Sequence, residues 1–239
     1  RPMVFLPAAT VWTLIVCTVV LMVFWLPHRV LRRLGHLWTR PVTWMIRYVL
    51  GIRYELRGRE NIVAPAVILC KHQSAWETIV LQEVFPDVLY VWKKELRMIP
   101  FFGWALATMP MISINRGAGK DALKQLLTQG KLRLSQGYSV IVFPEGTRVA
   151  PGSKRRYKIG GAYLAVDASV PVVPVALNSG EVWGRNAFLK RPGTVKVSIG
   201  PRIDTQGLTA EEVNARAEAW IESEMGRVSP HLYRHEGAA

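Results

Sequence analysis

Through most of this chain, short apolar runs alternate with segments in which the apolar residues have helical spacing. Each run is four to six residues long, and together they are residues 66–70, 88–92, 111–114, 139–143, 172–177 and 195–199. Runs of this length without a polar face are typical of strands that are buried on both sides. The segments between them have helical spacing, and the last helix is expected to begin at the capping box Thr209-Ala210-Glu211-Glu212. This alternation predicts an α/β fold with a mixed, largely parallel sheet flanked by helices on both faces.

The beginning of the chain is different, because residues 3–27 contain no charged side chain. As a single helix this run would be about 37 Å long, which is enough to cross a hydrocarbon core of about 30 Å. A basic cluster follows directly, and such a cluster predicts that the rest of the chain lies on the cytoplasmic side of a membrane. Its members are His28, Arg29, Arg32, Arg33, His36 and Arg40.

Residues 41–50 carry Trp44 and Tyr48 beside Arg47, a composition typical of a helix that lies against lipid headgroups. We therefore expect an N-terminal membrane-associated helical segment in the bacterial inner membrane. A buried core helix is the alternative for residues 3–27, whereas a signal peptide fits poorly because the charge follows the run. The predicted organisation is membrane-anchoring helices at residues 1–50, one catalytic α/β domain at 51–230 and a tail at 231–239.

The chain is strongly basic, with 31 Lys and Arg against 17 Asp and Glu and a formal charge of +14. This balance favours polyanionic partners such as nucleic acid, anionic lipid or phosphorylated substrates. The aromatic–basic motifs of nucleic-acid readers are missing, so we expect anionic membrane lipid as a partner and no nucleic acid. His231 and His235 have the spacing of a helical metal pair, but no cluster of cysteines or carboxylates accompanies them. We therefore expect no metal site.

His72 and Glu77 are the first candidate catalytic pair. His72 follows an apolar run and precedes a helix, which predicts a position at the carboxyl edge of the sheet, where α/β sites are usually built. An imidazole can take a proton from a hydroxyl and give it to a leaving group, and it needs an orienting partner on its second nitrogen. Glu77 can be this partner if His72 lies in a loop and Glu77 lies in the first turn of the helix.

Two other interpretations of this segment remain open. Ser74 to Glu77 also has the form of a capping box, in which Glu77 only accepts a hydrogen bond from a backbone amide. Cys70 precedes His72 by two residues, so a Cys–His pair could act as a covalent nucleophile. A small buried residue at the end of a strand is the simpler interpretation of Cys70.

Residues 143–148, Phe-Pro-Glu-Gly-Thr-Arg, form a second candidate segment after another apolar run. Gly146 permits a positive φ or the close approach of a ligand, and Thr147 offers a hydroxyl. Arg148 can hold a phosphate through two hydrogen bonds, and Glu145 would hold the loop or orient Arg148. The basic segment 154–158 predicts a second phosphate-binding patch, with a solvated loop as the alternative. Together, the two segments predict a site that deprotonates a hydroxyl beside a bound anion.

The order of these segments resembles the 1-acylglycerol-3-phosphate acyltransferases, also called lysophosphatidic acid acyltransferases, of the glycerophospholipid acyltransferase family. Four blocks occur in the order typical of the family: residues 72–77, 94–104, 143–148 and 170–175. The resemblance implies that His72 is the catalytic base and Glu77 its partner. It implies that the acceptor phosphate and glycerol are bound by Lys94, Gly103, Arg116, Glu145, Gly146, Thr147 and Arg148. Pro171 and Pro174 would shape the acyl side of the site.

The implied reaction transfers an acyl group to the sn-2 hydroxyl of 1-acylglycerol 3-phosphate and forms phosphatidate in phospholipid biosynthesis. Acyl-CoA or acyl-carrier protein would be the co-substrate, and we expect no cofactor. One alternative is a sister acyltransferase that acts on another lysophospholipid, a lyso-ornithine lipid or glycerol 3-phosphate. A basic peripheral membrane-binding protein is the alternative that is not an enzyme.

Two residues depart from the pattern of the family. Lys71 occupies the position before the histidine where the family usually has Asn, and a role in binding the donor is one expectation for it. Glu77 occupies a position where Asp is more common, and its extra methylene group predicts a different placement of the helix start. Both changes leave His72 as a candidate base with Glu77 as its acidic partner.

Overall fold

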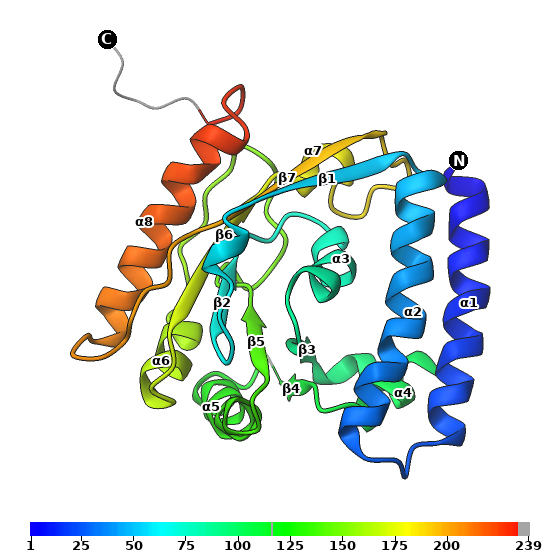
Figure 1. Ribbon diagram of the computed structural model, residues 1–239, viewed down its shortest axis with the longest axis horizontal. Coiled ribbons are helices and arrows are strands. Elements are labelled where there is room, and N and C mark those ends of the chain that lie inside the picture. Colours follow the sequence, from blue (N-terminus) through cyan, green and yellow to red (C-terminus); the bar gives the residue numbers. More distant parts are fainter. Residues whose placement is uncertain (116, 234–239) are drawn as a thin grey trace.

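The computed structural model describes residues 1–115 and 117–233, and within them a seven-stranded sheet has the order β1-β7-β6-β2-β5-β3-β4 (Figure 1). Every neighbouring pair is parallel except β6 and β7, which are antiparallel. The predicted mixed, largely parallel sheet is therefore confirmed. The strands are β1 Ile52–Arg57, β2 Val67–Cys70, β3 Val88–Lys93, β4 Ile112–Ile114, β5 Ser139–Val142, β6 Val172–Leu177 and β7 Gly193–Ile199.

Helices cover both faces of the sheet. Alternate side chains of β2 face opposite ways: Val67 and Leu69 pack in the core with α6 and α8, and Ile68 and Cys70 pack in the core with α2 and α3. The helices are α1 Pro2–Met22, α2 His28–Tyr48, α3 Trp76–Val84, α4 Phe102–Thr108, α5 Lys120–Ser135, α6 Gly160–Asp167, α7 Ser179–Val182 and α8 Ala210–Val228, with the short 3₁₀ helices η1 Arg59–Asn61 and η2 Lys94–Met98. The capping box predicted for the last helix is confirmed, because the Thr209 hydroxyl accepts the Glu212 N–H.

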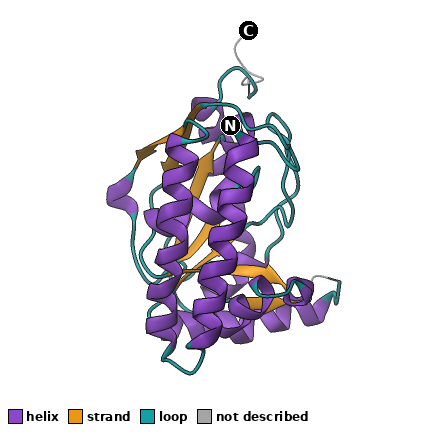
Figure 2. Ribbon diagram, turned by 90° about the vertical axis from the view of Figure 1, so that its right-hand side faces the viewer, coloured by secondary structure: helices purple, strands orange, loops and turns teal. Residues whose placement is uncertain are grey.

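α1 and α2 form an antiparallel pair along one side of the molecule (Figure 2). The prediction of one helix over residues 3–27 was wrong, since α1 ends at Met22 and α2 begins at His28. Pro27 disfavours helical backbone at Leu26 and so separates the two helices. The basic cluster is consequently the first half of α2 and not a flank before a separate helix at residues 41–50.

α1 is apolar on nearly all of its surface. Among the described residues it is the one helix that is long and apolar enough to cross a membrane, with a mean hydropathy of 2.3. Only 22% of the 18-residue stretch of α1 that has this hydropathy is buried inside the protein. A core helix of a soluble domain would bury most of its length, so α1 is suited to anchor the chain to a membrane.

The N-terminal helices share a core with the α/β domain. Phe5 of α1 and Ile46 of α2 belong to the same buried cluster as Trp76 of α3 and Val195 of β7. The side chain of Trp38 also donates a hydrogen bond to the Thr13 hydroxyl at 2.8 Å, which joins α2 to α1. The predicted boundary at residue 50 therefore divides the chain by composition but does not separate two hydrophobic cores.

β1 and the short helix α7 are among the elements that were not predicted. β1 lies at the edge of the sheet, where it pairs in parallel with β7 from Ile52 opposite Gly193. Its sequence, Ile-Arg-Tyr-Glu-Leu-Arg, alternates with charged residues and is mostly exposed, so it lacks the apolar run of a central strand. The short helix α7 directly follows β6, and it positions a hydroxyl for the site.

Candidate active site

His72 lies in the loop between β2 and α3, as predicted for a residue at the carboxyl edge of the sheet. Its Nδ1 atom is 3.0 Å from Oε2 of Glu77, which is the second residue of α3. The imidazole stacks on the ring of Phe143, with centroids 3.9 Å apart and an angle of 14° between the rings. A carboxylate on Nδ1 favours the tautomer that carries its proton there, which leaves the Nε2 lone pair to accept a proton.

Glu77 is fully buried and accepts hydrogen bonds on both oxygens. The N–H groups of Gln73 and Ser74 donate to Oε1 at 3.0 and 2.8 Å, and the Ser179 hydroxyl of α7 donates to the same oxygen. The capping interpretation and the dyad interpretation are therefore compatible. One carboxylate receives the backbone amides that precede α3 and also the imidazole, so the start of the helix and the histidine are fixed together.

The second segment, residues 143–148, surrounds His72 from the end of β5. Glu145 is fully buried, and its Oε2 atom accepts the backbone N–H of His72 at 2.7 Å. Gly146 has a φ of +70°, and a Cβ atom there would lie 3.0 Å from the Lys158 side chain. The geometry favours the loop-holding role that the sequence allowed for Glu145, because a side chain with no exposed surface cannot touch the acceptor.

Glu145 also pairs with Lys71, whose ammonium is 3.0 Å from its Oε1 atom. Burial raises the pKa of the Glu145 carboxyl to about 7, although Lys71 and the His72 N–H oppose the shift. Burial acts to lower the pKa of Lys71, but the carboxylates of Glu145 and Glu222 outweigh it and raise that pKa. Lys71 is wholly buried, so the expectation that it helps to bind the donor was wrong.

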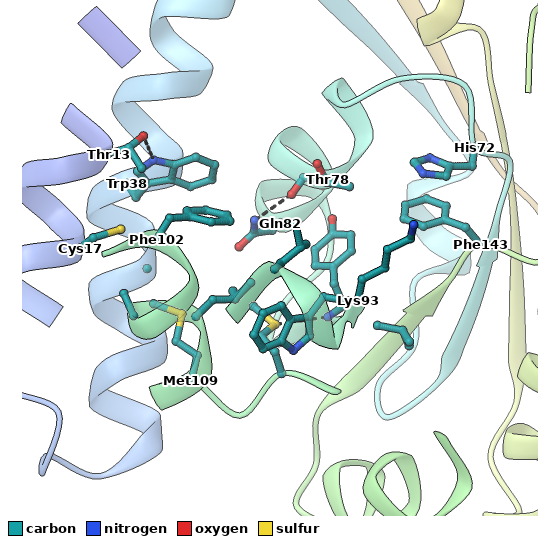
Figure 3. A pocket seen from close by; sticks show the side chains of 18 of the residues that line it. Thr13, Cys17, Trp38, His72, Thr78, Gln82, Lys93, Phe102, Met109 and Phe143 are labelled. Carbon is teal, nitrogen blue, oxygen red and sulfur yellow. Dashed lines mark hydrogen bonds between the residues drawn. The ribbon is translucent and has the colours of Figure 1, made fainter. Parts of the chain in front are cut away.

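A cavity of about 570 Å³ opens beside His72 and extends to the N-terminal helices. In Figure 3, His72 and Phe143 lie at one end, and Cys17 and Trp38 lie at the other. Its apolar wall comes mainly from three helices and one strand: Val16, Cys17 and Val20 of α1, Trp38 of α2, Trp92 of β3, and Phe102, Ala105 and Leu106 of α4, with Met109 directly after α4. A long apolar cavity that ends at a candidate base is suited to hold a hydrocarbon chain at its reactive end.

Among the residues that the structure describes, three Lys and Arg residues line the cavity: Lys93, Arg148 and Arg185. Lys93 ends β3, and its side chain is directed toward Phe143 and His72 (Figure 3). The predicted residue, Lys94, is exposed on η2 and does not line the cavity. Consecutive residues at the end of a strand point to opposite sides, so the sequence could not choose between two adjacent lysines without the register of β3.

Thr147 and Arg148 line the cavity, whereas Gly103, Pro171 and Pro174, like Lys94, Glu145 and Gly146, do not. Gly103 is a packing position, because a Cβ atom there would lie 2.1 Å from the Leu96 carbonyl oxygen where α4 meets η2. Pro171 directly precedes β6 and Pro174 lies inside it, and the Pro171 carbonyl accepts the Val67 N–H. Pro174 shares a strand face with residues that pack against α8, on the side away from the cavity.

The remaining candidates have simpler outcomes. Cys70 is fully buried and does not line the cavity, and burial raises the pKa of its thiol well above the ordinary value, so the structure disfavours a nucleophilic thiolate. In the basic segment 154–158 the cationic residues are exposed and lie outside the cavity lining. His231 approaches Glu181 at 3.4 Å. Arg116 and His235 lie outside the described residues.

Several site residues were missed by the sequence analysis. Ser179, Arg185 and Asn186 reach the site from the segment after β6, more than a hundred residues after His72 in the chain. Cys17 and Trp38 were assigned only to membrane anchoring, yet they form the wall of the cavity. No local pattern marks these positions, because their proximity to His72 depends on the order of the strands.

Comparison with known proteins identifies the family. The Acyltransferase family profile matches residues 53–178. A 1-acyl-sn-glycerol-3-phosphate acyltransferase from Pseudomonas aeruginosa is 47% identical over 197 residues, which are 81% of this chain and 77% of that protein. A mouse protein, 1-acyl-sn-glycerol-3-phosphate acyltransferase alpha, is 33% identical over 72% of this chain and 62% of its own length.

The fold also has a close counterpart among solved structures. The 1-acyl-sn-glycerophosphate acyltransferase of Thermotoga maritima superposes on this chain with a TM-score of 0.76. The superposition covers 95% of this chain and 93% of the Thermotoga maritima chain. At 23% sequence identity this likeness supports the fold alone. The matching profile and the relatives above show that the chain belongs to the 1-acyl-sn-glycerol-3-phosphate acyltransferases of the Acyltransferase family.

Proposed function

We propose that this protein transfers an acyl group from acyl-CoA or acyl-carrier protein to the sn-2 hydroxyl of 1-acylglycerol 3-phosphate and so forms phosphatidate. The observation that carries the proposal is the position of His72, paired with Glu77, at one end of a largely apolar cavity. The cationic residues Lys93 and Arg148 line the same cavity. A base, a hydrocarbon site and a phosphate site thus meet at one place, as this reaction requires.

The transfer begins when Nε2 of His72 takes the proton of the sn-2 hydroxyl. The hydroxyl oxygen attacks the thioester carbonyl, and a tetrahedral intermediate forms. When the intermediate collapses, the carbon–sulfur bond breaks and the imidazolium returns its proton to the leaving thiolate. The products are phosphatidate and a free thiol. A positioned base of this kind contributes about 10² to 10⁴ in rate, and alignment of two bound substrates contributes further.

Lys93 and Arg148 are the residues we assign to the acceptor phosphate, with Arg185 at its side. The Arg185 guanidinium donates to the Arg148 carbonyl at 3.4 Å, which places two guanidinium-bearing residues together at the rim. An arginine fork can bind a phosphate through two parallel hydrogen bonds, and a lysine adds a point charge. This arrangement favours an acceptor that carries a phosphate over a neutral glyceride.

The apolar cavity would receive an acyl chain beside the base. Its wall of methyl, thioether and aromatic groups offers each buried methylene group about 0.8 kcal/mol of transfer free energy. Cys17 lies in the wall farthest from His72 in Figure 3, so its size should limit the length of chain that fits. Cys17→Trp should therefore move the preference of the enzyme toward shorter chains, which competition between acyl-CoA donors of different length would measure.

Membrane attachment completes the proposal. α1 exposes Met3, Val11 and Ile15, and α2 carries exposed Trp44 beside Arg47. An apolar helix next to a basic amphipathic helix is suited to a bilayer with anionic headgroups. We propose that these helices hold the enzyme at the bacterial inner membrane with the α/β domain on the cytoplasmic side, where acyl thioesters are available.

Release of free thiol from acyl-CoA or acyl-carrier protein, followed with a thiol reagent, tests the function directly. Addition of 1-acylglycerol 3-phosphate should start the release, and His72→Ala should lower it at least about 10²-fold. Lyso-ornithine lipid, glycerol 3-phosphate and other lysophospholipids serve as competing acceptors. Faster release with one of them would favour a sister acyltransferase, and no release with any acceptor would favour a membrane-binding protein without activity.

A further inference from the structure

Lys71 is a fully buried cation that does not line the cavity. It lies 3.0 Å from Oε1 of Glu145 and 2.6 Å from Oε1 of Glu222, which belongs to α8. A buried ammonium is stable only when it is paired and hydrogen-bonded. Lys71 meets this requirement by bridging the loop after β5 and the C-terminal helix.

The remaining polar groups around Lys71 complete this cluster. The Tyr157 hydroxyl donates to Oε1 of Glu222 at 2.9 Å, and the Tyr157 and Tyr233 rings lie 6.0 and 5.9 Å from the ammonium. Gln73 joins the cluster to the catalytic loop, because its amide donates to the Tyr233 hydroxyl at 3.3 Å. The Lys71 ammonium thus faces two carboxylates, one from the loop after β5 and one from α8, and lies near two tyrosine rings.

The cluster acts on the base through the main chain. Glu145, whose Oε1 pairs with Lys71, uses its Oε2 to accept the backbone N–H of His72 at 2.7 Å. The His72 carbonyl in turn accepts the Val149 N–H at 2.8 Å. Both polar groups of the His72 backbone are therefore bound to the segment that carries Arg148. One carboxylate, Glu145, thus contacts both the Lys71 ammonium and the backbone of His72.

We propose that Lys71 and Glu222 are positioning residues for the acyl transfer: they fix the Glu145 carboxylate that holds the backbone of His72, and they couple α8 to the catalytic base. The inference rests on the proposed function. It also accounts for the departure at residue 71, since a lysine there needs the α8 carboxylate of Glu222 as a counter-charge. Neither Lys71 nor Glu222 lines the cavity, so both act through His72 and not on a substrate.

The test compares Glu222→Gln and Lys71→Met with the wild-type protein in the thiol-release assay, using acyl-CoA and 1-acylglycerol 3-phosphate. Displacement of a catalytic group by about 1 Å lowers rates about 10²-fold. We expect kcat to fall about tenfold in Glu222→Gln and about 10²-fold in Lys71→Met, with both KM values within about twofold of wild type. Glu211→Gln is the matched control, because it makes the same chemical change at an exposed position of α8 and should leave kcat unchanged.

A pH profile separates positioning from a general loss of structure. Lys71 opposes the rise in the Glu145 pKa, so its removal should move the acid limb of kcat to higher pH in Lys71→Met, while the profile of Glu211→Gln stays in place. Thermal unfolding identifies variants that do not fold, and if Lys71→Met fails to fold, Glu222→Gln decides alone.

Folded variants with kcat within about twofold of wild type would overturn the inference. A rise in KM at constant kcat would overturn it as well. Wild-type protein that releases no thiol would refute the proposed function, and the inference with it. Active wild type with unaffected variants would refute the inference alone.

Discussion

Replacement of Glu77 by Gln should remove most of the activity and leave the fold intact. Oε1 of Glu77 accepts from the Gln73 N–H and the Ser179 hydroxyl, and Oε2 faces Nδ1 of His72. Glutamine has one acceptor oxygen and one NH₂ donor. If the oxygen stays with the backbone amides, the NH₂ group faces Nδ1. The His72 proton must then move to Nε2, the atom that should receive the hydroxyl proton.

The size of the effect follows from the tautomer. In a serine protease, the equivalent change from carboxylate to amide lowers kcat about 10⁴-fold because the imidazole adopts the wrong tautomer. A factor of 10⁴ is about 5.4 kcal/mol of transition-state stabilisation. Glu77 is buried and does not line the cavity, so KM should change little. The weakened start of α3 should cost about 1 kcal/mol of unfolding free energy, which leaves the protein folded.

Steady-state thiol release measures kcat, and thermal unfolding by circular dichroism verifies the fold. Glu77→Asp is the control, because it keeps the charge but shortens the side chain by about 1.5 Å. It widens the contact with Nδ1 beyond the present 3.0 Å, so we expect a loss of only about 10²-fold. A folded Glu77→Gln protein that keeps more than about a tenth of the wild-type kcat would show that His72 does not depend on this partner.

Three further predictions test other parts of the site. Arg148→Ala should raise the KM for 1-acylglycerol 3-phosphate about 10- to 100-fold, because a hydrogen bond to a charged group contributes about 1.5–3 kcal/mol; an unchanged KM in initial-rate kinetics would exclude Arg148 from phosphate binding. Cys70→Ala should keep kcat within about twofold, since the transfer needs no covalent acyl-enzyme; an inactive but folded variant would restore the thioester route. Burial raises the pKa of Glu145 from its ordinary value of 4.5 to about 7, so the native state binds that proton more tightly than the unfolded state. The free energy of unfolding should therefore fall as pH rises through this window, by about 1.4 kcal/mol per unit, and urea unfolding of Glu145→Gln should lack this contribution.

The central sheet was predictable because its strands are buried on both faces. β2, β5 and β6 are covered by helices on either side, so apolar runs such as residues 139–143 mark them without alternation. β1 escaped prediction for the opposite reason: it is an edge strand with charged residues at alternate positions. The order of the strands was not predictable, since it depends on packing between segments far apart in the chain.

The candidate active site was predictable where its contacts are local. His72 and Glu77 lie five residues apart, and a loop followed by a helix start brings them together. Ser179 completes the shell of Glu77 from a distance of 102 residues, and Glu222 reaches Lys71 across 151 residues. These long-range contacts form only because of where α7 and α8 pack. The spacing of residues in the sequence does not predict that packing. The choice between Lys93 and Lys94 failed for a related reason, because it depends on the register of one strand end.

The N-terminal helices also line the cavity, a role that their composition does not predict. An apolar N-terminus predicts a membrane anchor, but Cys17 of α1 and Trp38 of α2 also line the same cavity as His72. Ile46 of α2 packs in the core that contains Trp76 of α3, directly beside the catalytic loop. A helix pair that exposes apolar side chains on one side and lines the cavity on the other would let an acyl chain approach His72 along apolar surface. Removal of these helices should therefore abolish transfer even in detergent, where a simple anchor would be dispensable.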